Sequence, residues 1–99
     1  MCTLLPKAHA PLHVLIGESD NWTPAGPCVE LIHRVSAAGA PADIVVYPDA
    51  YHDFDDPDLP LQTRDHIWTP SGTATIGTNP AARADAIVRV TAAFRAKLQ

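Results

Sequence analysis

The chain has 99 residues, of which 46% are hydrophobic and 18% are charged, and its formal net charge is -4. This length allows one domain at most, and the composition is that of a globular chain rather than a disordered one. The negative charge, without a cluster of lysine or arginine residues, argues against nucleic acid and anionic membranes as partners.

No stretch indicates a membrane span or an export signal. The longest apolar runs fall far short of the roughly eighteen residues that a membrane-spanning helix needs. Residues 1–11 also lack the basic start and the apolar core of a signal peptide. We therefore expect a cytoplasmic protein. Cys2 and Cys28 could pair in principle, but without an export signal we expect free thiols. No spacing of histidines, acids and cysteines indicates a metal site, and no cofactor is expected.

The first half of the chain has the pattern of a strand, a helix and a second strand. Leu12–Ile16, closed by Gly17, is an apolar run typical of a strand covered on both faces, as in a parallel sheet. From about Pro27 to Gly39 the period is helical. Its apolar stripe consists of Cys28, Leu31, Ile32 and Val35. The second strand is Ile44–Tyr47. This order predicts a βαβ unit with parallel strands, because the helix returns the chain to the starting edge.

The second half of the chain has one clear element, a helix at its end. Residues 57–79 predict a surface loop with a short strand at Thr73–Ile76. Asn79 resembles an N-cap, and Pro80 suits the first helical position. An amphipathic helix is then expected from about Ala81 to Leu98. We expect its buried stripe to consist of Ala84, Ile87, Thr91, Phe94 and Leu98.

Two side chains with complementary chemistry follow the two predicted strands. Asp20 lies just beyond the first strand, and His52 lies in an aromatic, acidic turn just beyond the second. The carboxyl ends of parallel strands meet at one edge of a sheet, so the two loops are expected to bring these side chains into contact. A histidine near neutral pH can act as a general base, and a carboxylate can orient its imidazole.

Several segments together resemble the C-terminal part of the dienelactone hydrolase family of α/β-hydrolases. The segments that carry the resemblance are Pro11–Pro24, Val45–Pro48, Ala50–Phe54 and Asn79–Asp85. The resemblance extends over nearly all of residues 11–98. It implies an α/β fold, with part of an α/β-hydrolase sheet built from the βαβ unit and the C-terminal amphipathic helix.

The resemblance also implies a function and roles for particular residues. Residues 1–99 would be the C-terminal segment of a hydrolase domain whose nucleophile-bearing half is absent. Asp20 would be the acid and His52 the base of a nucleophile–histidine–acid triad, in which the nucleophile precedes both along the chain. Trp22 and Phe54 would be substrate-binding wall residues. The substrate would be a small-molecule ester or lactone, cleaved through an acyl-enzyme.

Two features depart from the family pattern. The nucleophile should lie on a tight, glycine-flanked turn ahead of Asp20, and Cys2, which has neither a preceding strand nor flanking glycines, does not fit this requirement. Family members that cleave lactones have an arginine soon after the histidine and phenylalanine, whereas Asp55 and Asp56 follow here. Two acids would repel an anionic substrate such as a dienelactone.

A chain of this kind is expected to be inactive alone, and to associate with itself or with an upstream hydrolase half, since its few strands leave apolar surface exposed. Two other functions remain open. The chain can be a non-catalytic truncated remnant that serves as an interaction or dimerisation piece. It can also be a flavodoxin-like binding module, in which Asp20 and His52 are incidental.

Overall fold

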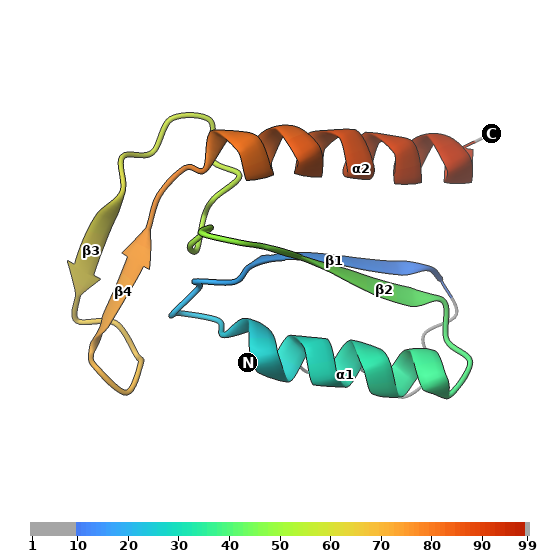
Figure 1. Ribbon diagram of the computed structural model, residues 1–99, viewed down its shortest axis with the longest axis horizontal. Helices are drawn as coiled ribbons and strands as arrows, with labels where there is room; N and C mark the ends of the chain where they lie inside the picture. The colour runs from blue at the N-terminus through green and yellow to red at the C-terminus, as the bar shows by residue number, and fades with distance from the viewer. Residues whose placement is uncertain (1–9, 99) are drawn as a thin grey trace.

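The computed structural model describes residues 10–98, which form a small α/β structure with two short sheets and two helices (Figure 1). The elements in chain order are β1 (Leu12–Gly17), α1 (Ala25–Ala37), β2 (Ala42–Tyr47), β3 (Gln62–Asp65), β4 (Thr73–Ile76) and α2 (Pro80–Leu98). No helix in this part of the chain combines the length and the apolar character needed to cross a membrane.

The first half of the described chain forms the predicted βαβ unit. β1 and β2 are parallel and in register, from Leu12 opposite Ala42 to Gly17 opposite Tyr47. α1 and α2 lie on opposite sides of this strand pair (Figure 1). The βαβ prediction is therefore confirmed, with α1 and β2 each beginning two residues earlier than predicted.

Cys28 is buried on α1, as its place on the helical stripe predicts. The expectation of a free thiol is wrong at this position, because Cys28 is disulfide-bonded. That expectation rested on the absence of an export signal, which does not determine which sulfur atoms a fold brings together. Cys2 lies outside the described residues.

The core under α2 is built from aromatic and small side chains. The buried members of this cluster are Tyr47, Ala50, Phe54, Ala82 and Ala86, with Leu15 and Val45 packed against them. The rings of Tyr47 and Phe54 have their centroids 5.2 Å apart at an angle of 50°, a favourable tilted arrangement. The alanines let the helix backbone approach these rings closely. This packing joins the first turns of α2 to the end of β2 and to the loop that follows it.

α2 begins as predicted but buries a different face. The main-chain N–H of Ala82 donates to Asn79 Oδ1 at 3.1 Å, which confirms the N-cap. The predicted buried stripe is wrong: Ile87, Phe94 and Leu98 are 48%, 63% and 83% exposed. Ala84 and Thr91, the other two members of that stripe, are exposed as well. The helix instead turns its alanine face to the core, because contacts with residues far along the chain determine its rotation.

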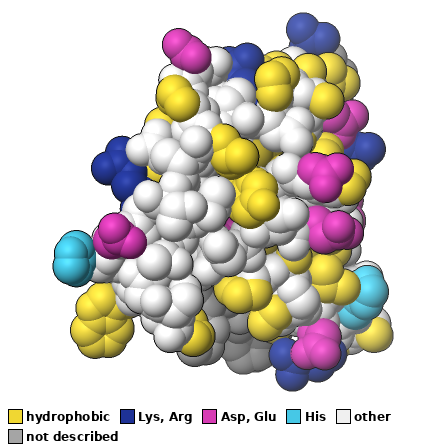
Figure 2. All heavy atoms as spheres, turned by 60° about the vertical axis from the view of Figure 1, so that its left-hand side comes forward, with side chains coloured by type: hydrophobic (Ala, Val, Ile, Leu, Met, Phe, Trp, Pro, Cys, Tyr) yellow, Lys and Arg dark blue, Asp and Glu magenta, His cyan; other side chains and the backbone are white. Residues whose placement is uncertain are grey.

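A hairpin that the sequence only half predicts lies beside the main strand pair. β3 and β4 are antiparallel, with Gln62 opposite Ile76 and Asp65 opposite Thr73. β4 occupies the predicted short strand, whereas β3 was not predicted, because its polar residues lack an alternating apolar pattern. Figure 2, which brings this side of the molecule forward, shows hydrophobic side chains at the surface among scattered charged ones.

A buried tyrosine connects β2 to α2. The Tyr47 hydroxyl donates to Asp85 Oδ2 at 2.6 Å, and Arg89 Nε donates to the same oxygen at 2.6 Å. Burial, followed by the hydrogen bond to Asp85, raises the pKa of Tyr47 to about 12. The Tyr47 hydroxyl and then Arg89 lower the pKa of the Asp85 carboxyl. These contacts help to determine how α2 is rotated against the core.

The raised pKa of Tyr47 predicts a loss of stability at alkaline pH. In the unfolded chain this hydroxyl ionises near its ordinary value of 10.0, but in the folded chain it stays protonated until about 12. A raised folded pKa stabilises fully below the unfolded value, and the stabilisation is lost as the pH rises through that interval. As the pH rises through this range, the unfolding free energy of Tyr47→Phe should therefore fall less than that of the unchanged chain. Midpoints of urea unfolding measure the difference. Tyr51→Phe is the matched control and should behave as the unchanged chain does; equal losses in all three would contradict the prediction.

Candidate active site

The two residues predicted as acid and base come together at one edge of the parallel strands. Asp20 follows β1 and His52 follows β2, and these strands end at the same level because Gly17 pairs with Tyr47. His52 Nδ1 lies 3.0 Å from Asp20 Oδ2, within hydrogen-bonding distance. Side chains separated by thirty-two positions thus meet as the strand order predicts.

The carboxylate of Asp20 is buried and fully supplied with donors. Its side chain is only 6% exposed. Oδ1 accepts hydrogen bonds from the main-chain N–H groups of Trp22, at 2.9 Å, and Thr23, at 2.7 Å. Oδ2 faces His52. These three partners compensate for the loss of water around the carboxylate and hold it in one orientation.

The contact with Asp20 also determines which nitrogen of His52 is available for chemistry. An ionised carboxylate only accepts hydrogen bonds, so Nδ1 carries a proton and donates a hydrogen bond to Asp20. In the neutral ring Nε2 is then an acceptor, as a general base requires. Nε2 lies 3.7 Å from Asp53 Oδ1, which is too long for a hydrogen bond but close enough for an ion pair when the ring is protonated. The His52 side chain is 30% exposed.

A close main-chain approach at Gly17 holds the two loops together. The N–H of Glu18 donates to the carbonyl of Tyr47 at 2.8 Å, and the N–H of Ser19 donates to the carbonyl of Ala50 at 3.0 Å. A Cβ atom on Gly17 would lie 2.1 Å from the carbonyl oxygen of Ala50, a distance that no real contact allows. Only glycine therefore lets the loop of Asp20 lie against the loop of His52 in this arrangement.

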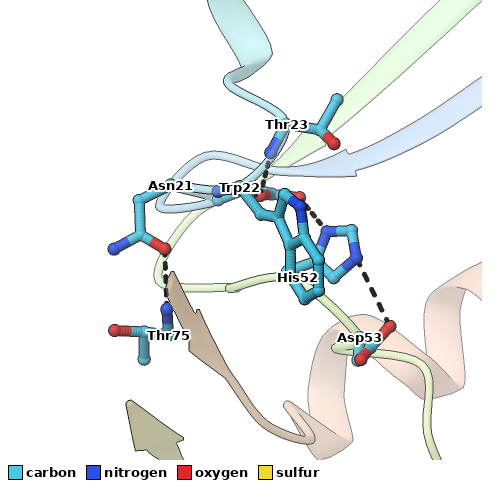
Figure 3. Close-up of polar contacts among 7 residues, drawn as sticks. Asn21, Trp22, Thr23, His52, Asp53 and Thr75 are labelled. Atoms are coloured by element: carbon cyan, nitrogen blue, oxygen red, sulfur yellow. Dashed lines mark hydrogen bonds and ion pairs between the residues drawn. The ribbon is translucent and has the colours of Figure 1, made fainter. Parts of the chain in front are cut away.

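The end of β4 supports both loops. Asn21 Oδ1 accepts a hydrogen bond from the main-chain N–H of Thr75 at 2.8 Å (Figure 3). His52 pairs with Ile76 in an isolated bridge, and the N–H of Gly77 donates to the carbonyl of His52 at 3.1 Å. The sequence analysis missed these contacts, because nothing next to Asn21 indicates a partner 54 positions away.

A cavity of about 460 Å³ opens beside the imidazole. It is lined by His13, Leu15, Ile16, Gly17, Asp20, Thr23, His52, Asp53, Phe54, Asp55, Ala86 and Val90. Phe54 is thus placed in its wall, whereas Trp22 is not among the lining residues. The indole of Trp22 lies instead beside the imidazole of His52, with ring centroids 4.8 Å apart (Figure 3). The catalytic roles of Asp20 and His52 and the substrate-binding roles of Trp22 and Phe54 stay predictions.

The lining of this cavity contains no serine and no cysteine. Thr23 is its one hydroxyl residue, and its main-chain N–H is already bound to Asp20. Cys2, the upstream cysteine considered in the sequence, lies outside the described residues. Between residues 10 and 98 no group of three histidine, cysteine or acidic side chains is placed to hold a metal ion. Among the described residues, the cavity therefore brings a carboxylate and an imidazole together without a serine or cysteine side chain beside them.

The family model described as "Dienelactone hydrolase family" matches residues 2–98 of the chain. No curated protein and no solved structure matches it significantly.

The close approach at Gly17 predicts a large effect of a single methyl group. Gly17→Ala should lower the unfolding free energy by about 3 kcal/mol, the upper end of the typical cost of overpacking, because the clashing atoms are main-chain atoms. It should also separate Asp20 from His52, which would change the imidazole chemical shifts of His52. Gly26→Ala is the matched control, since a Cβ there would meet nothing within 4 Å. Equal stability of the two variants would show that the loops do not need this contact.

Proposed function

Because this chain belongs to the dienelactone hydrolase family, whose model matches residues 2–98, we propose that it supplies the acid and the base of an acyl hydrolase. Asp20 and His52 are the two members of the triad that it contributes. The nucleophile and the oxyanion hole come from a segment outside the described residues. The substrate is a small ester or lactone, and the strand pair β1–β2 is part of a larger α/β-hydrolase sheet.

The 3.0 Å contact between His52 Nδ1 and Asp20 Oδ2 is the observation that carries this proposal. In the reaction, Nε2 takes the proton of the nucleophile as it attacks the ester carbonyl, and Asp20 stabilises the imidazolium that forms. The imidazolium then returns the proton to the leaving alcohol. A water molecule, activated by Nε2 in the same way, attacks the acyl-enzyme and releases the acid.

The position of the cavity supports a nucleophile that arrives from beside β1. Among the described residues β1 pairs with β2 alone, so its other edge keeps unpaired main-chain groups that another strand can bind. The cavity is lined by His13, Leu15 and Gly17 of β1 and reaches the imidazole of His52. A segment added along this edge would bring its side chains toward Nε2.

The same contact bears on the other two functions that the sequence leaves open. A binding module in which Asp20 and His52 are incidental does not require the carboxylate to be oriented by two main-chain N–H groups and aimed at the imidazole. A non-catalytic remnant can keep this geometry, and activity alone separates it from a hydrolase. We therefore favour the hydrolase function and test it by turnover.

Hydrolysis of p-nitrophenyl acetate tests the proposal. We expect the 99-residue chain alone to stay at the background rate, and a longer chain that includes the sequence preceding residue 1 in its gene to turn the ester over. In that longer chain, His52→Gln should lower kcat about 10³- to 10⁴-fold, because the base is lost. Asp20→Asn should lower kcat by a similar factor, because the imidazole then adopts the wrong tautomer.

His33→Gln provides the matched control, since His33 is an exposed histidine on α1. It should leave kcat unchanged. If the longer chain shows no turnover, or if His52→Gln and His33→Gln have the same effect, the hydrolase proposal fails and the non-catalytic interaction piece becomes the better account.

A further inference from the structure

The cavity beside His52 has an unbalanced charge. Three carboxylates line it, from Asp20, Asp53 and Asp55, and its lining contains no lysine and no arginine. Asp20 differs from the other two, because it is buried and its charge is compensated by two main-chain N–H groups and by His52. Asp53 and Asp55 are exposed, and the one ion pair that they form among the described residues joins Asp53 to His52 Nε2 at 3.7 Å. Their charges therefore act on whatever enters the cavity.

We propose that Asp53 and Asp55 are specificity-determining residues, which make this site select a substrate that carries a positively charged group over one that carries a carboxylate. This inference rests on the proposed function for the reaction, but the charge selection itself requires no nucleophile. It names the substrate class that the family match leaves open.

The surroundings of the two carboxylates support this role. Asp53 has one ionic neighbour, Nε2 of His52 at 3.7 Å, so its charge lies next to the nitrogen at which the reaction occurs. It follows His52 directly, and its φ of 63° lies in the left-handed region, which aspartate tolerates better than most residues with a Cβ atom. This turn sets the carboxylate beside the imidazole.

Asp55 brings a second charge to the same wall. A basic side chain contacts this residue, since Arg83 Nε donates a hydrogen bond to the main-chain oxygen of Asp55 at 3.2 Å. Within residues 10–98 its carboxylate forms no ion pair, and Arg83 is not part of the cavity lining. The guanidinium therefore offsets the charge of Asp55 only in part, because it is bonded to the main chain and not to the carboxylate.

The expected size of the selection follows from the exposure of these carboxylates. The interaction free energy between a unit charge and a carboxylate several ångströms away in a water-rich site is somewhat smaller than that of a surface ion pair in direct contact. It is favourable for a cation and unfavourable for an anion. Two carboxylates together should favour a cation over a neutral molecule of the same shape by about threefold to tenfold, and disfavour an anion by a similar factor. Added salt should reduce both effects.

Binding of three small aromatic probes to the full 99-residue chain tests the proposal. The probes are benzylammonium, benzyl alcohol and benzoate, followed by NMR shifts of the His52 imidazole and the Trp22 indole. We expect Kd for benzylammonium to be about threefold to tenfold lower than for benzyl alcohol, with benzoate weakest. The double variant D53N/D55N should bind benzylammonium and benzyl alcohol alike.

Asp58→Asn is the matched control, because Asp58 belongs to the same acidic turn but does not line the cavity. It removes one charge and should keep the preference for benzylammonium. The proposal is overturned if benzoate binds the unchanged chain as tightly as benzylammonium, or if Asp58→Asn weakens benzylammonium as much as D53N/D55N does. A failure of ester turnover with cation selection intact would remove the hydrolase function alone. Turnover without cation selection would remove this inference alone.

Discussion

The in-register pairing of β1 with β2 is the constraint on which the rest of the site depends. Gly17 lies opposite Tyr47, so both strands end at the same level and their loops leave the sheet side by side. The missing side chain of Gly17 then allows the main chains of the two loops to touch, through the hydrogen bond from Ser19 to Ala50. A one-residue shift of either strand would turn that strand's side chains to the other face of the sheet and would move Asp20 away from His52.

Local sequence patterns predicted the elements whose interaction partners are close along the chain. They failed where contacts between distant residues determine the structure. The βαβ unit and the cap of α2 at Asn79 follow from periodicity and from residue types that act over a few positions. The rotation of α2 depends on Tyr47, which lies 38 positions before Asp85. The most hydrophobic stripe of α2 therefore did not predict its buried face. β3 is polar and obtains its structure from pairing with β4, a contact that periodicity does not reveal.

The contact between Asp20 and His52 was predictable because it requires only strand order, but its support was not. Two donors to Asp20 are main-chain groups of the loop that follows it, so this loop organises its own carboxylate. The imidazole, in contrast, lies on a loop held by the end of β4, through the bridge to Ile76 and the N–H of Gly77. The hairpin that the sequence analysis half missed thus supports the base. The contacts that orient Asp20 and His52 thus come from the loops of both residues and from the end of β4.

The acidic turn after His52 can serve the chemistry and the choice of substrate at the same time. At 3.7 Å, Asp53 Oδ1 is too far from Nε2 to form a hydrogen bond, so it leaves that nitrogen available to a nucleophile. It is near enough to stabilise the imidazolium that exists while the proton is held by the ring. A carboxylate in direct contact would instead occupy Nε2 and compete with the reaction. The distance therefore lets one negative charge stabilise the protonated imidazole and attract the cationic substrate that we propose, without blocking Nε2.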